Sequence, residues 1–116
     1  MNTLAKKNFA SPDATASPAD LMSTETITVN GHTFMKITIQ PGWVWTKHLA
    51  PKVGTDICQM DHLMYILSGH VAAKMADGTE LVFGPGDVGN IPPGHDGWTV
   101  GDEPASWIEL PHEHAA

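Results

Sequence analysis

The sequence predicts an all-β protein of one domain, and three observations support this prediction. Beyond residue 22, short runs of β-branched and aromatic residues alternate with turns that contain glycine and proline, as is typical of short strands. No window in that part of the chain keeps a helical period for three turns. A chain of 116 residues can bury one modest core but has no room for crossover helices between its strands. The strands must therefore bury their apolar faces against one another, as a sandwich, a jelly roll or a small barrel.

The chain divides into an arm, a domain and a tail. Residues 1–22 are rich in Ala, Ser, Thr, Pro and Asp and show no sustained period, so we expect an irregular N-terminal arm that becomes ordered only by lying on another surface. Residues 23–111 form the predicted β-domain. Residues 112–116 form a short C-terminal tail with a His-Glu-His sequence that could bind metal only adventitiously.

The strongest turn signal in the domain is Asn30-Gly31. Both central positions of a type I′ turn need positive φ angles, which Asn and Gly adopt at low cost. The dipeptide lies between two β-type runs, residues 25–29 and 33–39, and therefore predicts a hairpin. Further strands are predicted over residues 43–49, 62–67, 70–76, 80–83, 88–91, 98–100 and 105–110, separated by turns rich in glycine and proline.

Charge and cysteine content exclude several classes of partner. The chain carries six basic and thirteen acidic residues, for a formal net charge of -7, and every basic residue is a lysine. We expect no nucleic-acid or membrane partner, because a phosphate surface requires a basic face and arginine is the usual phosphate clamp. The apolar runs are far shorter than the roughly 20 residues that cross a bilayer. The single cysteine, Cys58, fits a reducing compartment, so a cytoplasmic protein is favoured.

Most of the informative residues lie between positions 42 and 94. This stretch opens with Gly-Trp-Val-Trp-Thr-Lys-His, continues with Cys-Gln-Met-Asp-His and Tyr-Ile-Leu-Ser-Gly, and closes with Pro-Gly-Asp, four residues and Pro-Pro-Gly-His. On these motifs the sequence resembles the cupin superfamily, and in particular its small single-domain members, over roughly residues 39–110. The resemblance implies a single-domain cupin-type jelly-roll β-barrel behind the irregular N-terminal arm.

The resemblance also implies a metal site, but with an altered set of ligands. Cupins usually bind metal through three histidines and one glutamate. Here His48 corresponds to the first histidine of the first motif, whereas Ala50 occupies the place of the second. His62 stands where the family has its glutamate, and Cys58 falls on a histidine position when the motif is counted back from the glycine that ends it.

The second motif departs from the family in the same way. Gly97 holds the place of its histidine, and His95 comes two residues earlier. We expect His48, His62 and His95, with Cys58 as a fourth donor, to hold a divalent transition metal; Zn, Fe, Mn, Ni and Cu are not distinguished. The alternative is that these histidines lie in a pocket or in turns and hydrogen-bond to the backbone.

A substrate pocket is predicted beside this site. Its expected lining residues are Trp43, Trp45, Gln59, Met64, Tyr65 and Trp98. Tryptophan offers a large flat apolar surface with one hydrogen-bond donor, although such residues also form cores and dimer interfaces. Tyr65 is the candidate catalytic residue, because the expected cavity face lacks glutamate and arginine and acid–base work would fall on a tyrosine or a histidine.

Two small-molecule functions remain open at this point, beside a third possibility, a structural or remnant domain that only dimerises. The first is a metal-dependent enzyme with dioxygenase-, isomerase- or lyase-like chemistry on a small organic substrate, for which a neutral or weakly acidic, partly aromatic molecule fits best. The second is a non-catalytic cupin that binds or senses a small molecule without metal. The resemblance further implies a homodimer in which the apolar N-terminal segment covers an open sheet edge.

Overall fold

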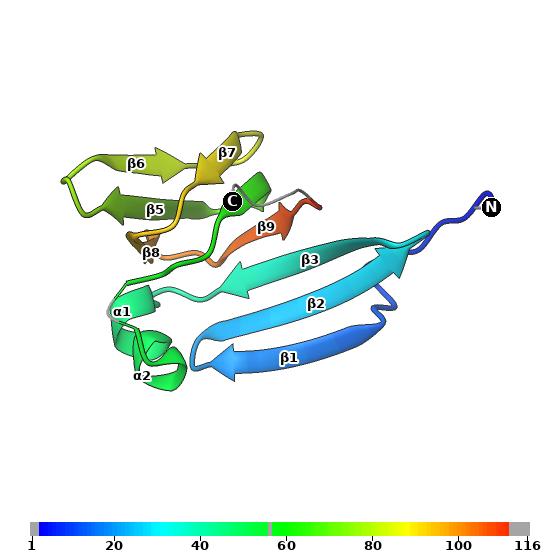
Figure 1. Ribbon diagram of the computed structural model, residues 1–116, viewed down its shortest axis with the longest axis horizontal. Coiled ribbons are helices and arrows are strands. Elements are labelled where there is room, and N and C mark those ends of the chain that lie inside the picture. The colour runs from blue at the N-terminus through cyan, green and yellow to red at the C-terminus, as the bar shows by residue number, and fades with distance from the viewer. Residues whose placement is uncertain (1–2, 56, 112–116) are drawn as a thin grey trace.

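The computed structural model describes residues 3–55 and 57–111, so the predicted tail, residues 112–116, lies outside the described residues. Within these ranges the chain forms nine strands and two short helices. The strands build two sheets with the orders β1-β2-β3-β9-β4-β7 and β6-β5-β8 (Figure 1). The paired strands are antiparallel throughout. The all-β prediction is therefore confirmed.

The bounds of the elements follow the chain from end to end. The strands are β1 Ala14–Ala19, β2 Met22–Val29, β3 His32–Ile39, β4 His62–Ser68, β5 His70–Met75, β6 Glu80–Phe83, β7 Val88–Ile91, β8 His95–Val100 and β9 Ala105–Glu109. The helices are α1 Trp45–His48 and α2 Ala50–Val53.

The hairpin predicted at Asn30-Gly31 is confirmed. β2 and β3 pair from Met22↔Ile39 up to Val29↔His32, which leaves a two-residue turn. Asn30 and Gly31 have φ angles of 48° and 82°, as a type I′ turn requires.

The N-terminal arm is not irregular throughout, which corrects the prediction for residues 1–22. β1 pairs with β2 and forms one edge of the larger sheet (Figure 1). Only its last residue is buried, so this strand needs no apolar face and gives no alternating signal in the sequence. The Asp13 carboxylate fixes the start of the strand, because it accepts hydrogen bonds from Lys7 Nζ at 2.7 Å and from the Thr28 N–H at 2.9 Å.

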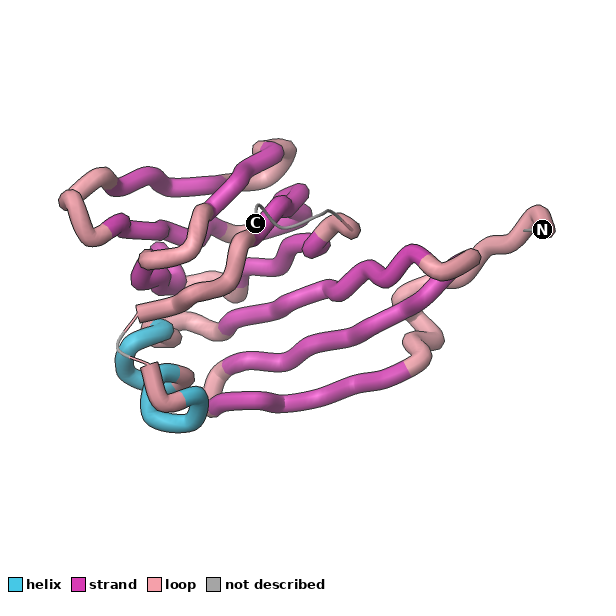
Figure 2. The backbone as a smooth tube through the Cα atoms, viewed as in Figure 1, coloured by secondary structure: helices cyan, strands magenta, loops and turns pink. Residues whose placement is uncertain are grey.

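The strand predicted over residues 43–49 is wrong, because this segment forms α1 and leads into α2 (Figure 2). Trp43 and Trp45 are both buried, and their spacing of two residues is what mimicked a strand. The Asp96 carboxylate of β8 stabilises the helical turn, because it accepts hydrogen bonds from the Thr46 N–H and hydroxyl, each at 3.1 Å. Four-residue helices are too short for their period to be read from the sequence.

The core lies between the two sheets. Ile39, Met64 and Ile66 are its most deeply buried large side chains. On β4, Met64 and Ile66 alternate with Tyr65 and Leu67, which are each 42% exposed, so the strand presents one face to the core and the other to solvent. The described residues include no helix that is long and apolar enough to span a membrane. The homodimer stays a prediction.

Gly69 is required at the turn between β4 and β5. Its φ angle is 67°, and a Cβ at this position would lie 2.2 Å from the backbone oxygen of Pro104, where no shift of a flexible side chain relieves the clash. Gly78 also has a positive φ angle, of 93°, but nothing lies within 4 Å of the corresponding Cβ position.

We predict that Gly69→Ala lowers the free energy of unfolding by about 3 kcal/mol or more, through backbone strain and the clash with Pro104. The matched control, Gly78→Ala, adds only the strain of a left-handed alanine, roughly 1–2 kcal/mol. Urea denaturation of the two variants and the unchanged protein measures both effects. Equal losses in the two variants would contradict the clash.

Candidate functional site

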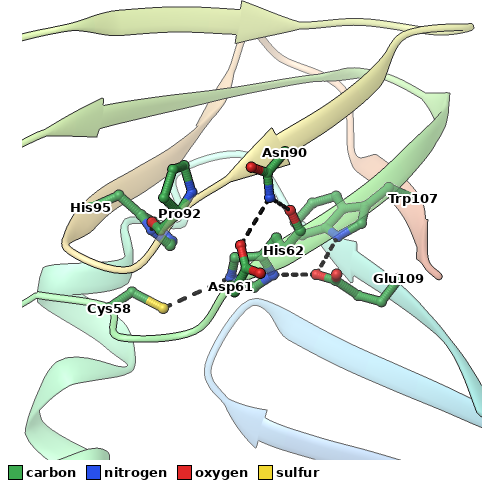
Figure 3. Close-up of polar contacts among 8 residues, drawn as sticks. All are labelled: Cys58, Asp61, His62, Asn90, Pro92, His95, Trp107 and Glu109. Carbon is green, nitrogen blue, oxygen red and sulfur yellow. Dashed lines mark hydrogen bonds and ion pairs between the residues drawn. The ribbon is translucent and has the colours of Figure 1, made fainter. Parts of the chain in front are cut away.

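Cys58, His62 and His95 form a cluster of potential metal ligands. One donor atom from each residue lies within 4.8 Å of the others. His62 begins β4, His95 begins β8, and Cys58 lies in the segment that precedes β4 (Figure 3). The structure thus brings together three of the four predicted metal ligands.

The backbone fixes Cys58 against β8. The Cys58 N–H donates to the His95 carbonyl oxygen at 2.8 Å, and the Cys58 carbonyl oxygen accepts from the Gly94 N–H at 2.7 Å and from the His95 N–H at 3.2 Å. Cys58 and His95 are 3% and 4% exposed. The thiol and this imidazole are therefore held beside each other by the main chain.

His62 links the thiol to a carboxylate. Its Nε2 atom lies 3.8 Å from Cys58 Sγ, and its Nδ1 atom makes a short ion pair with Glu109 Oε1. Glu109 Oε1 also accepts a hydrogen bond from Trp107 Nε1 at 3.1 Å (Figure 3). His62 packs edge-to-face on His95, with 5.1 Å between the ring centroids.

The imidazoles of His62 and His95 are both hydrogen-bonded to the protein through Nδ1. His95 Nδ1 lies 2.7 Å from the Pro92 carbonyl oxygen, which can only accept, so this nitrogen carries the proton. His62 Nδ1 is likewise engaged by Glu109. In each ring, Nε2 is left as the nitrogen available to a ligand, as in metal-binding histidines whose other nitrogen is hydrogen-bonded to a carboxylate or a carbonyl.

The same contacts shift two pKa values in opposite directions. Burial favours the neutral thiol, but hydrogen bonds from His62 and His95 outweigh it and lower the pKa of Cys58 to about 6. Burial also disfavours the His62 imidazolium, yet its hydrogen bonds to Cys58 and Glu109 raise the pKa of His62 to about 9. Both shifts favour a thiolate beside an imidazolium in the metal-free site.

A cavity of about 540 Å³ adjoins the cluster, and all three donor residues are among its lining residues. Its walls are largely apolar, with the indoles of Trp43, Trp45 and Trp107 among them. Among the described residues, no lysine, aspartate or glutamate lines it. The cavity therefore offers a flat aromatic surface and a few polar groups, with the donor cluster on one side.

Four of the six predicted pocket residues line this cavity: Trp43, Trp45, Gln59 and Met64. Their role in binding a ligand stays a prediction. Tyr65, the candidate catalytic residue, does not line it, because the period of β4 places Tyr65 on the solvent face, opposite to Met64. Trp98 is also absent from the lining: it alternates on β8 with the buried Gly97 and Thr99 and forms an isolated bridge with Val44.

His48 is not part of the cluster, which corrects the predicted ligand set. It lies in α1, where its Nδ1 atom accepts a hydrogen bond from the Val44 N–H at 3.0 Å. For His48, the alternative of a histidine bound to the backbone is the one observed. The motif alignment failed here because it assumed a strand, whereas a helical turn directs the side chain differently.

Glu109 is the residue of the site that sequence reasoning missed, together with the hydrogen bond that Trp107 donates to it. Neither belongs to a motif that the sequence shares with cupins. They stand two residues apart on β9 and therefore share one face of the sheet, and a glutamate on the apolar face of a predicted strand was the signal available.

Comparisons of the structure with solved structures identify the fold. The polyketide cyclase RemF from Streptomyces resistomycificus is similar with a TM-score of 0.63 and 15% identity, covering 96% of this chain and 81% of that chain. A sugar phosphate isomerase of the cupin superfamily from Silicibacter pomeroyi has a TM-score of 0.57 and 16% identity, covering 82% of this chain and 61% of that chain. A cupin-like protein from Thermotoga maritima has a TM-score of 0.54 and 14% identity, covering 78% and 67% of the two chains.

The chain therefore has a cupin fold, as the motif resemblance implied. No protein-family model and no curated protein matches the sequence. At such low identity the structural likeness extends to the fold alone.

The pKa of Cys58 predicts a reactive thiol in metal-free protein. Iodoacetamide reacts with the thiolate, so after chelator treatment its rate should reach half of its maximum near pH 6 and be nearly constant above pH 7, instead of rising through pH 8.5 as for an ordinary cysteine. Mass spectrometry of protein quenched at intervals measures the rate. Because Cys58 is the single cysteine, Cys58→Ser is the blank, and a rate still rising steeply above pH 8 would contradict the prediction.

Proposed function

We propose that this chain is a small-molecule-binding cupin that holds a divalent transition metal through Cys58, His62 and His95 at the wall of its apolar cavity. The observation that carries this proposal is the convergence of three donor atoms within 4.8 Å of one another in the cavity lining. Three protein ligands with a further position open to water or substrate are the usual arrangement of catalytic zinc sites.

The chemistry of the donors supports a metal. Thiolate and imidazole are good ligands for borderline and soft transition metals. The rings are held by Glu109 and by the Pro92 carbonyl oxygen, so each presents Nε2 without needing to reorient. When bound, such an ion would polarise a carbonyl or enolate oxygen of the substrate.

The cavity walls indicate the kind of ligand. Polyketide-like and sugar phosphate substrates are the two classes named for structural relatives. The described lining includes no lysine, in a chain without arginine, so a phosphorylated sugar would find no cationic side chain there apart from the donor cluster, and a less charged ligand is favoured. Trp43, Trp45 and Trp107 instead favour a neutral or weakly acidic, partly aromatic molecule with an oxygen atom that faces the donors.

In this mechanism the chain supplies orientation and exclusion of water. The indoles hold the apolar body of the substrate, while the donor cluster receives its polar end. His62 would hold the ion through Nε2, while Glu109 engages the ring at Nδ1 and so fixes its orientation.

Elemental analysis tests the metal. We predict near-stoichiometric metal in untagged protein purified without chelator, and its loss in His62→Ala, because the imidazole donor is removed. His48→Ala is the matched control and should keep its metal, since His48 Nδ1 contacts the Val44 backbone and His48 is not part of the cluster. All proteins should carry alanine at His112 and His114, so that the tail adds no metal. A well-folded, metal-free protein with an intact cluster would overturn the proposal.

The second candidate is a binding or sensing cupin that uses no metal. The observation that favours it is that both imidazoles are already hydrogen-bonded through Nδ1 to protein oxygens, because such contacts hold the rings in place without an ion.

Tryptophan fluorescence separates the two candidates. We use a small polycyclic phenol as the probe. We predict that the probe concentration giving half-maximal quenching is at least about tenfold lower when metal is bound, because the phenol oxygen then gains the metal as a partner. Equal quenching of metal-loaded and chelator-treated protein would favour the metal-free binding module. Trp43→Phe is the control for stacking inside the cavity.

A further inference from the structure

We infer that the cluster is a thiolate centre selective for zinc, in which the Cys58 sulfur is the anionic ligand and no carboxylate coordinates the ion. This inference rests on the proposed metal site and specifies its ligand chemistry. Among the five metals left open by the sequence, this donor set disfavours manganese and favours thiophilic ions, of which we propose zinc.

The first argument is the position of Glu109, the carboxylate that is hydrogen-bonded to the cluster. Glu109 contacts the cluster only through His62 Nδ1, on the side of the ring away from Cys58. The same oxygen, Oε1, accepts from Trp107 Nε1, so the carboxylate is fixed in this supporting place (Figure 3). Among the described residues, the group that converges comprises one sulfur and two imidazoles, without an oxygen donor.

The second argument is that the sulfur is placed by the backbone. Cys58 is joined to His95 by an antiparallel bridge, with hydrogen bonds in both directions. The Cys58 carbonyl oxygen takes a further hydrogen bond from the Gly94 N–H. A buried cysteine held in this way delivers its sulfur to the two rings without ordering a loop first, which lowers the entropic cost of binding an ion.

The third argument is selectivity. Hard ions such as Mg²⁺ and Mn²⁺ prefer carboxylate, carbonyl and water oxygens, whereas a thiolate with imidazoles suits zinc. Zinc does not change oxidation state, so it supports isomerisation, cyclisation or elimination by polarising a carbonyl. The dioxygenase-like alternative considered for the sequence is disfavoured by this donor set.

Cobalt substitution tests the inference directly. Co²⁺ replaces zinc in such sites, and a thiolate ligand gives it a charge-transfer absorption in the near ultraviolet. We expect this band when the chelator-treated full-length protein, carrying His112→Ala and His114→Ala as above, is titrated with Co²⁺, and its loss on adding one equivalent of Zn²⁺. An excess of Mg²⁺ or Mn²⁺ should leave the band unchanged.

Two variants complete the experiment. Cys58→Ser should abolish the band and weaken Zn²⁺ binding by at least about a hundredfold. Removing a residue that only supports a metal ligand already lowers metal affinity about ten- to hundredfold, and Cys58 is itself the ligand. His48→Ala should keep both the band and the affinity. Circular dichroism checks that each variant is folded, and the band in the unchanged protein decides the question even if Cys58→Ser fails to fold.

The outcomes separate the inference from the proposed function. Stoichiometric Co²⁺ binding without the thiolate band, or displacement of Zn²⁺ by Mn²⁺, would overturn the thiolate centre and leave a metal site standing. Failure of the intact protein to bind Zn²⁺ or Co²⁺ would overturn both.

Discussion

The pairing of β9 with β4 is the constraint on which the site depends. β9 lies between β3 and β4 in the larger sheet, so it joins the N-terminal hairpin to the strands that follow the helices. Its register places Glu109 opposite Met64 and Trp107 opposite Ile66. His62 lies two residues before Met64 and is therefore the diagonal neighbour of Glu109 on the same face. A shift of one residue would turn Glu109 to solvent and leave His62 without its carboxylate.

The buried polar groups of the site stand in a row of hydrogen bonds, in which each group stabilises the next. An isolated charge in this interior would be strongly disfavoured, whereas carboxylate, imidazole and thiol in sequence allow a charge on each partner to be compensated by the next. Trp107 adds a neutral donor to the same carboxylate oxygen. The arrangement therefore retains a polar cluster inside an apolar wall without a lysine or an arginine, and the cavity beside it stays uncharged over most of its surface.

Local patterns in the sequence were sufficient for much of the fold. The turn at Asn30-Gly31 and the alternation of Met64 and Ile66 with exposed residues both follow from chemistry within a few positions. β1 and α1 were missed because segments outside them stabilise them: β2 pairs with the polar edge strand, and Asp96 of β8 accepts a hydrogen bond from the Thr46 N–H in the helix. The residue pattern within β1 or α1 does not reveal that β2 and β8 stabilise them.

The residues of the site also divide into those that the sequence predicts and those that depend on distant strand pairing. Cys58, His62 and His95 could be named from residue types and motif positions, because metal-binding side chains are few. Glu109 could not be assigned to His62 without the register of β9, since 47 positions separate the two residues. Tyr65 illustrates the opposite error: its chemistry suited a catalytic role, but the two-residue period of β4 had already directed it away from Met64 and the cavity.

Gly97 connects the altered motif to the shape of the cavity. The resemblance to cupins places a histidine at this position, and here the donor stands at His95 instead. Positions 95 and 97 share a face of β8, so the exchange moves the donor about 6.6 Å along the strand without turning it outward. A Cβ at position 97 would lie 3.3 Å from the Ala72 carbonyl oxygen, so a side chain there would be crowded as well as occupying the cavity wall. The glycine thus leaves room for a ligand, and the bridge between Cys58 and His95 brings a sulfur to the displaced imidazole.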